Sequence, residues 1–171
     1  MTVMVSIPGE PQGKARARVV RTKTGRSISY TPDKTAAYEK LACQCYQNQV
    51  GGWKFPPDCP LRVEISAFFS IPKSKSKREK EQMREGELLP IKKPDADNIA
   101  KIICDALNGV AYADDKQIIS LTIDKGYSLE PKVIVEIKEV KTGENIRGTD
   151  RDCQAGGIPG QADRNRILGC V

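Results

Sequence analysis

The sequence contains no histidine, and this absence excludes much of the chemistry that enzymes use. Imidazole-based zinc, copper and non-haem iron sites cannot form. A Ser-His-Asp triad, a Cys-His dyad and an HExxH protease motif are excluded for the same reason. Carboxylates remain as candidate metal ligands, and sites built from their oxygens suit Mg²⁺ or Mn²⁺.

Paired cysteines and long apolar runs are also missing. The chain has no C-x-x-C motif and no disulfide framework, so a zinc site is not expected; its cysteines are Cys43, Cys45, Cys59, Cys104, Cys153 and Cys170. Cys45 and Cys104 fall on apolar helical faces, which is typical of small core residues in a reducing compartment. No apolar run approaches a membrane span, and the first residues lack a signal-peptide pattern. We therefore expect a cytoplasmic protein without a membrane segment.

Length and charge restrict the domain organisation and the partner. At 171 residues the chain is long enough to bury one good core. Its net charge of +6 and its pI near 9.0 favour a polyanionic partner. From Lys141 onward Gly, Asp, Arg and Asn are frequent and no apolar period is sustained. We therefore expect one domain over residues 1–140 and a flexible tail over 141–171.

The most informative stretch is residues 92–118, which contains two acidic pairs around one predicted helix. Asp95 and Asp97 precede the apolar part of the helix. Asp114 and Asp115 come just past its end. One short helix could therefore bring together carboxylates from two loops.

The helix between the acidic pairs has a clear amphipathic pattern. We expect it to begin near Asn98 and to end before Gly109, where a left-handed cap is favoured. Its buried face follows the i, i+3, i+4 spacing and consists of Ile99, Ile102, Ile103, Ala106 and Leu107. Lys101 lies on another face, one turn after Asp97, and can reach back over it.

Each of these residues also has an ordinary explanation. A single aspartate before a helix usually caps its free amides. Lys101 and Asp97 would then be an i, i+4 ion pair, and Asp114-Asp115 a polar turn. Carboxylates packed together repel one another, however, and usually need a cation. A calcium EF-hand is excluded because the loop lacks the required Gly and Glu. The cation that suits such a set of carboxylate oxygens is Mg²⁺ or Mn²⁺.

Basic segments surround the acidic stretch. Residues 10–40 carry eight Lys and Arg against three Asp and Glu, and residues 73–93 carry eight against four. Residues 94–115 carry one Lys against five Asp. An acidic metal pocket framed by basic segments is suited to phosphodiester hydrolysis, because the surroundings attract the backbone and the metal neutralises charge at phosphorus.

Five basic residues are the candidates for contacts with nucleic-acid phosphates. In an extended backbone, the alternating residues Lys14, Arg16 and Arg18 project to one side and form a row of basic side chains. A solvated edge strand would show the same pattern. Lys73 and Lys75 lie a short connection ahead of the first acidic pair, which makes them further candidates.

The order of the predicted elements indicates an α+β fold. Strands are expected over residues 2–7, 61–70, 118–127 and 132–138, a hairpin within 21–30, and the main helices over 32–49 and from residue 98. The last two strands are expected to form an antiparallel hairpin around Glu130-Pro131. The expected architecture is a small mixed sheet of about four core strands packed against two main helices, plus an N-terminal basic hairpin.

The acidic stretch also resembles a known family. Its pattern K-P-D-x-D-N-[IL]-x-K-x-x-x-D-A-L-N-G, followed by Y-x-D-D-x-Q-I, is similar to the signature of the RusA family of Holliday-junction resolvases, common in phages and prophages. The segments K-A-R-A-R and Y-T-P resemble the N-terminal region of such proteins. The resemblance implies that Asp95, Asp97 and Asp115 are Mg²⁺-binding catalytic carboxylates and that Lys101 is the catalytic lysine. Asp114 is the weaker candidate of its pair.

These observations predict a Mg²⁺-dependent, structure-selective endodeoxyribonuclease that resolves four-way DNA junctions in recombination and repair. A non-catalytic DNA-binding phage regulator with a degenerate acidic cluster is one alternative. An enzyme acting on a small phosphorylated substrate is another. The complete set of catalytic-type residues argues against the first alternative, and the basic segments argue against the second.

Junction resolution also predicts an oligomeric state. Two symmetric nicks require two active sites, and this chain has one acidic cluster and no internal repeat. We therefore expect a homodimer with a two-fold interface, as the family resemblance also implies. The N-terminal strand and the Trp53–Pro60 loop are the candidate interface segments.

Overall fold

The computed structural model describes residues 1–16, 18–21, 27–30 and 32–141. These ranges form a four-stranded sheet and a separate two-stranded sheet, with three α-helices and one 3-10 turn, η1. The strands are β1 Thr2–Pro8, β2 Arg18–Arg21, β3 Ser27–Tyr30, β4 Leu61–Ser70, β5 Ile118–Ser128 and β6 Lys132–Glu139. The helices are α1 Asp33–Val50, α2 Lys77–Glu85 and α3 Ala96–Leu107, and η1 covers Asp115–Gln117. The expected α+β class is confirmed, while the expected tail, apart from Lys141, lies outside the described residues.

The four-stranded sheet has the order β1-β6-β4-β5. β4 pairs in parallel with β5 and antiparallel with β6, so it lies between them. Five alternate side chains of β4 are at most 2% exposed, namely Leu61, Val63, Ile65, Ala67 and Phe69. This alternation shows that one face of β4 is covered, and the edge strand β1 has the same alternating burial.

The predicted hairpin of β5 and β6 around Glu130-Pro131 is therefore wrong, since β4 separates the two strands. Strands two positions apart lie about 10 Å from each other. The connection of residues 129–131 can cross this gap, because an extended residue covers about 3.3 Å. Alternation in the sequence shows that each segment is a strand, but it does not identify the partner.

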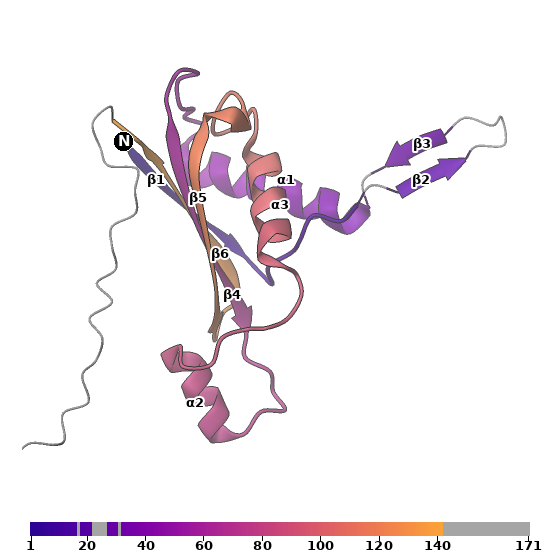
Figure 1. The fold of residues 1–171 in the computed structure, drawn as a ribbon, viewed down its shortest axis with the longest axis vertical. Helices are drawn as coiled ribbons and strands as arrows, with labels where there is room; N and C mark the ends of the chain where they lie inside the picture. Colours follow the sequence, from indigo (N-terminus) through magenta and orange to yellow (C-terminus); the bar gives the residue numbers. More distant parts are fainter. Residues whose placement is uncertain (17, 22–26, 31, 142–171) are drawn as a thin grey trace, which may run out of the picture.

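α1 and α3 cover the same face of the four-stranded sheet, and they also contact each other (Figure 1). The predicted buried face of α3 is confirmed, because all five of its residues are at most 6% exposed. α3 begins at Ala96, two residues before the expected start, and Gly109 has the left-handed φ of +76° that was expected there. No helix within the described ranges is both long and apolar enough to cross a membrane.

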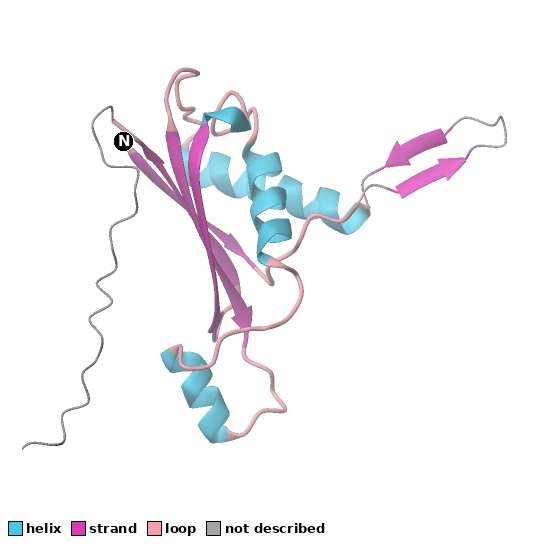
Figure 2. Cartoon of the chain, viewed as in Figure 1, coloured by secondary structure: helices cyan, strands magenta, loops and turns pink. Residues whose placement is uncertain are grey.

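Two smaller elements lie outside the four-stranded sheet. β2 and β3 pair antiparallel and stand apart from the four-stranded sheet (Figure 2), which confirms a hairpin in this region, although its tip, residues 22–26, lies outside the described residues. α2 contacts β5, and its first turn is closed by a capping box between Ser76 and Glu79. The charged segment before the acidic stretch is thus a capped helix that buries only Met83.

Candidate active site

Asp95 and Asp97 lie at the N-terminal end of α3, where both side chains are exposed. Asp95 occupies the N-cap position, and its backbone carbonyl accepts a hydrogen bond from the Ile99 amide at 3.1 Å. Among the described residues, the Asp95 carboxylate accepts no capping hydrogen bond, and the Asp97 carboxylate accepts a bond of 3.4 Å from the Asn98 side-chain amide. Capping therefore does not account for these two carboxylates, and their oxygens face solvent at the positive end of the helix dipole.

Lys101 lies one turn further along α3 and is exposed. Within the described residues it forms no ion pair with Asp97, so the ordinary i, i+4 explanation does not apply in this structure. Positions 97, 101 and 104 share one helical face. The Lys101 ammonium is therefore available to a ligand bound on that face.

The two residues of the second acidic pair have different surroundings. An Asp114 carboxylate oxygen accepts a hydrogen bond from the Lys116 amide at 3.1 Å and caps η1. This bond from the Lys116 amide holds the pKa of Asp114 below its usual range. Asp115 is exposed and begins the 3-10 turn. The turn thus engages Asp114 and leaves Asp115 as the stronger ligand candidate.

Gln117 fixes the loop that carries this pair, and sequence reasoning missed it as a site residue. Its side chain is 6% exposed and forms four hydrogen bonds. Its Oε1 accepts from the Ala113 amide at 2.8 Å and the Asp114 amide at 3.3 Å, while its Nε2 donates to the carbonyls of Pro56 at 2.7 Å and Cys59 at 3.1 Å. The available signal was the glutamine of the Y-x-D-D-x-Q-I pattern, because a buried amide must find partners.

The loop with Asp115 folds back onto the C-terminal half of α3. The Tyr112 hydroxyl donates to the Cys104 carbonyl at 2.8 Å. Burial, assisted by the nearby charges of Asp105 and Asp115, raises the pKa of the Cys104 thiol to about 11. Cys104 lies seven positions after Asp97, which corresponds to about 10 Å along the helix. Lys101 therefore lies between the two acidic elements.

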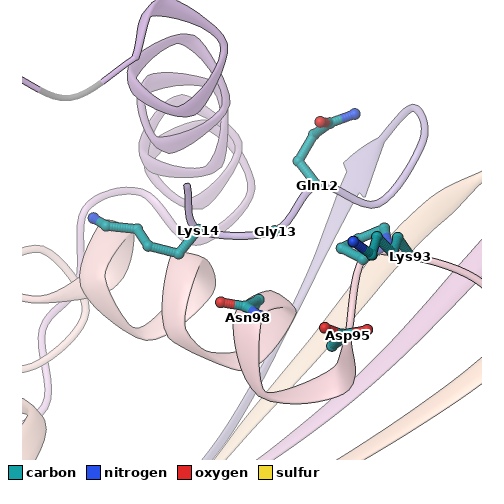
Figure 3. Close-up of a pocket in the computed structure, with 7 residues that line it drawn as sticks. Gln12, Gly13, Lys14, Lys93, Asp95 and Asn98 are labelled. Atoms are coloured by element: carbon teal, nitrogen blue, oxygen red, sulfur yellow. The ribbon is translucent and has the colours of Figure 1, made fainter. Parts of the chain in front are cut away.

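A strap formed by residues 12–14 crosses the N-terminal end of α3 (Figure 3). The Lys14 amide donates to the Asn98 carbonyl at 2.8 Å. A Cβ atom at Gly13 would lie only 2.7 Å from the Cβ of Pro94, so glycine permits this close approach. The strap and the helix end enclose an open pocket of about 370 Å³, lined by Gln12, Gly13, Lys14, Lys93, Pro94, Asp95 and Asn98.

Lys14 itself points along α3 and away from Asp95 (Figure 3). Its ammonium bonds to Glu39 on α1 and to Asp105 on α3, the latter at 2.9 Å. Burial lowers the pKa of Lys14, but the two carboxylates outweigh burial and raise it above its usual value. Lys14 thus joins the two helices through its charge.

The other predicted phosphate contacts lie on the surface or outside the described side chains. Arg16 is exposed, and Arg18 begins β2, with a side chain that lies outside the described ones. Lys73 and Lys75 are exposed, and Lys75 bonds to Glu79 at 2.9 Å. Residues 14–16 form no regular strand, and the Lys14 ammonium bonds to two carboxylates, so the shared orientation of these basic side chains stays a prediction for Arg16 and Arg18.

The predicted ligand set fits Mg²⁺ by its chemistry, because all donors are carboxylate oxygens. Asp95 and Asp97 come from one helix end, whereas Asp115 comes from the far loop. Within the described residues, no three acidic or cysteine side chains converge on a common point. Mg²⁺ usually binds through one or two carboxylates together with waters and substrate phosphates, so the Asp95–Asp97 pair is the natural starting point of a site.

The fold is an α+β domain in which two exposed aspartates and an exposed lysine lie on the helix α3 or at its N-cap. A model of the family described as Endodeoxyribonuclease RusA matches residues 8–138, and the chain therefore belongs to the RusA endodeoxyribonuclease family. The chain is also 43% identical over 83 residues to "Uncharacterized protein YqaN" of Bacillus subtilis (strain 168). This match covers 47% of the chain and 58% of that relative, so it spans little more than half of the relative's length.

Proposed function

We propose that this protein is a Mg²⁺-dependent endonuclease that nicks branched DNA, with four-way junctions as its principal substrate. Membership in an endodeoxyribonuclease family supports nuclease activity. The observation that carries the finer proposal is the exposure of Asp95 and Asp97 without capping bonds, beside an unpaired Lys101, within the described part of the chain. Carboxylates that are not engaged in capping are available to a cation.

Each site residue has a proposed task in phosphodiester cleavage. Asp95, Asp97 and Asp115 would hold the divalent ion, with the DNA phosphate completing its ligands. When bound, that ion supplies Lewis acidity at the phosphate. Lys101 would donate to the leaving 3′ oxygen or to a phosphate oxygen, offsetting negative charge that develops in the transition state.

Contacts with the DNA backbone are proposed for Arg16, Arg18, Lys73 and Lys75. The exposure of Arg16, Lys73 and Lys75 supports this assignment. Lys14 has two carboxylate partners, so we propose that it acts first as a link between helices. Resolution of a junction by paired nicks further requires two active sites, and we propose a homodimer whose nuclease domains comprise residues 1–140.

The candidate dimer segments differ in their present contacts. β1 is an edge strand of the sheet, which supports the N-terminal strand as an interface. The Trp53–Pro60 loop is engaged within its own chain, because Phe55 donates from its amide to the Ala111 carbonyl at 2.8 Å and Pro56 accepts from Gln117. We therefore favour β1 over this loop.

Cleavage of synthetic junctions by three charge-neutral variants tests the proposal. Asp95→Asn, Asp97→Asn and Asp115→Asn should each lower the nicking rate at least a hundredfold in saturating Mg²⁺, because removal of the charge weakens metal ligation while side-chain volume is kept. Junction affinity in Ca²⁺ should change little. The matched control is Asp124→Asn, an exposed aspartate of β5, which should nick at the wild-type rate.

Two results would contradict the assignment. Full activity in any one of the three variants would remove that residue from the ligand set. Wild-type protein that binds junctions tightly but never nicks them, with Mg²⁺ or Mn²⁺, would instead favour a non-catalytic DNA-binding protein. Linear duplex of the same sequence serves as the substrate control for structure selectivity.

A further inference from the structure

Lys125 of β5 contacts the segment that leads into Asp95. Its ammonium donates to the backbone carbonyl of Lys92 at 2.6 Å and to that of Pro94 at 3.1 Å. The Pro94 carbonyl belongs to the peptide group that connects directly to Asp95. Lys125 therefore bonds to the backbone within one residue of a proposed metal ligand, although it lies 30 residues away in the sequence.

The surroundings of Lys125 hold its side chain in this direction. Lys125 is opposite Ala67 of β4, on the face of the sheet that the helices cover, and the small alanine leaves room for its long stem. The Lys125 ammonium also lies 5.4 Å from the centre of the Phe69 ring. Half-burial and an aromatic face both favour one orientation of the side chain over free movement in solvent.

The segment that accepts these bonds is not held by regular secondary structure. Residues 88–94 lie between α2 and α3 and include neither helix nor strand. The carbonyls of Lys92 and Pro94 therefore have no ladder or helical partner, and Lys125 supplies one. Two of the three ammonium donors are used in this way, which distinguishes Lys125 from a lysine that is free to bind phosphate.

Lys92 provides a natural comparison. Its side-chain ammonium lies 4.7 Å from the centre of the Phe69 ring and 5.7 Å from that of Tyr127, so it shares the aromatic surroundings of Lys125. Only its backbone carbonyl takes part in the contact with Lys125. Removing the Lys92 charge should therefore leave the backbone contact intact.

We propose that Lys125 is a positioning residue, which fixes the backbone before Asp95 and thereby sets the direction of the Asp95 carboxylate toward the divalent ion. The inference rests on the proposed function, because it requires Asp95 to be a metal ligand. The physical reason is that a ligand on a loosely held segment loses affinity, since binding must then order the segment.

The test measures Mn²⁺ affinity by titration calorimetry without DNA, in wild type, Lys125→Met and Lys92→Met. We expect Lys125→Met to weaken Mn²⁺ binding about tenfold and Lys92→Met to change it less than twofold. In nicking assays, Lys125→Met should need about tenfold more Mg²⁺ for half-maximal rate, with a rate at saturating Mg²⁺ within about threefold of wild type. Junction affinity in Ca²⁺ should stay within twofold.

Several outcomes would overturn the inference. Unchanged Mn²⁺ affinity in Lys125→Met, or an equal loss in Lys92→Met, would show that the backbone contact does not set the ligand. A loss confined to junction affinity would make Lys125 a phosphate-binding residue instead. Should the Met variant lose its unfolding transition, Lys125→Gln carries the same expectations. Wild-type protein that neither binds Mn²⁺ nor nicks junctions would overturn the proposed function itself, whereas wild-type binding with an unaffected Lys125→Met variant overturns this inference alone.

Discussion

Lys14 is a candidate for two roles, stabilisation of the fold and binding of DNA, and one substitution distinguishes them. Its ammonium bonds to Glu39 and Asp105, so it links α1 to α3. Lys14→Met keeps most of the apolar stem and removes the charge. The variant leaves two carboxylates close together without a cation, and we expect the folded state to become less stable.

The expected decrease in the free energy of unfolding depends on how exposed the three side chains are. The exposed fraction of the side chain is 24% for Lys14, 25% for Glu39 and 33% for Asp105. Exposed ion pairs contribute about 0.2–1 kcal/mol, whereas breaking a buried pair costs about 3–5 kcal/mol. The three side chains are partly buried, so the effect should lie between these limits. We expect Lys14→Met to lower the free energy of unfolding by about 2 kcal/mol. In a domain of this size, that loss lowers Tm by about 4–8 °C.

The pH dependence gives an independent check. The folded-state pKa of Lys14 is raised above its ordinary value of 10.5, so its stabilising contribution is complete at neutral pH. The contribution is lost as the pH rises through the folded-state pKa. Urea unfolding at a series of pH values should therefore show a constant difference between wild type and Lys14→Met from pH 6 to 9, and a smaller difference above pH 10.5.

Arg16→Met is the matched control for the DNA-binding role. Arg16 is exposed and has no ion pair within the described ranges, so its removal should leave Tm unchanged. It should weaken junction binding and reduce the slope of log affinity against log salt by about 0.9 for each phosphate that the protein no longer neutralises. If Lys14→Met kept the wild-type Tm and instead reduced this slope, the linking role would be refuted.

Two further predictions concern α3. Lys101→Ala should lower the nicking rate far more than junction affinity, because a group that acts on the transition state affects turnover selectively. Weakened junction binding with an unchanged nicking rate would show instead that Lys101 only binds phosphate. Cys104, with its pKa raised to about 11, should be alkylated by iodoacetamide about a thousandfold more slowly at pH 8 than a fully ionised thiol, and about tenfold faster for each added pH unit. Peptide mass mapping would measure this, with guanidinium-unfolded protein as the control, and fast labelling at pH 8 would contradict the burial.

Local patterns predicted the elements of the fold well, because they depend on neighbouring residues. The alternation over residues 61–70 predicted β4 with the bounds that the structure shows. The helical spacing identified the buried face of α3, and Gly109 marked its end. Strand order was not predictable in this way. The separation of β5 and β6 by β4 depends on which strands bury most surface together, and this information is spread over the whole chain.

The same distinction between local sequence patterns and long-range contacts applies to the candidate site. Residues with acidic chemistry were visible in the sequence, because Asp95, Asp97 and Asp115 stand in an unusual pattern around one helix. The side chains that hold these elements were not visible. Gln117 reaches carbonyls about 60 residues away, and Lys125 reaches the segment before Asp95 from a distant strand. Such contacts have no local signature, since they exist only once the sheet has formed.

The proposed metal ligands and the residues that support them should respond differently to added metal. Substitution of Asp95 removes a ligand, and its effect should persist at any metal concentration. Substitution of Gln117 or Lys125 leaves every ligand in place and loosens the backbone that carries one, so added metal should restore much of the rate. The dependence of the nicking rate on Mg²⁺ concentration therefore separates the residues that bind the ion from those that hold the binding residues in position.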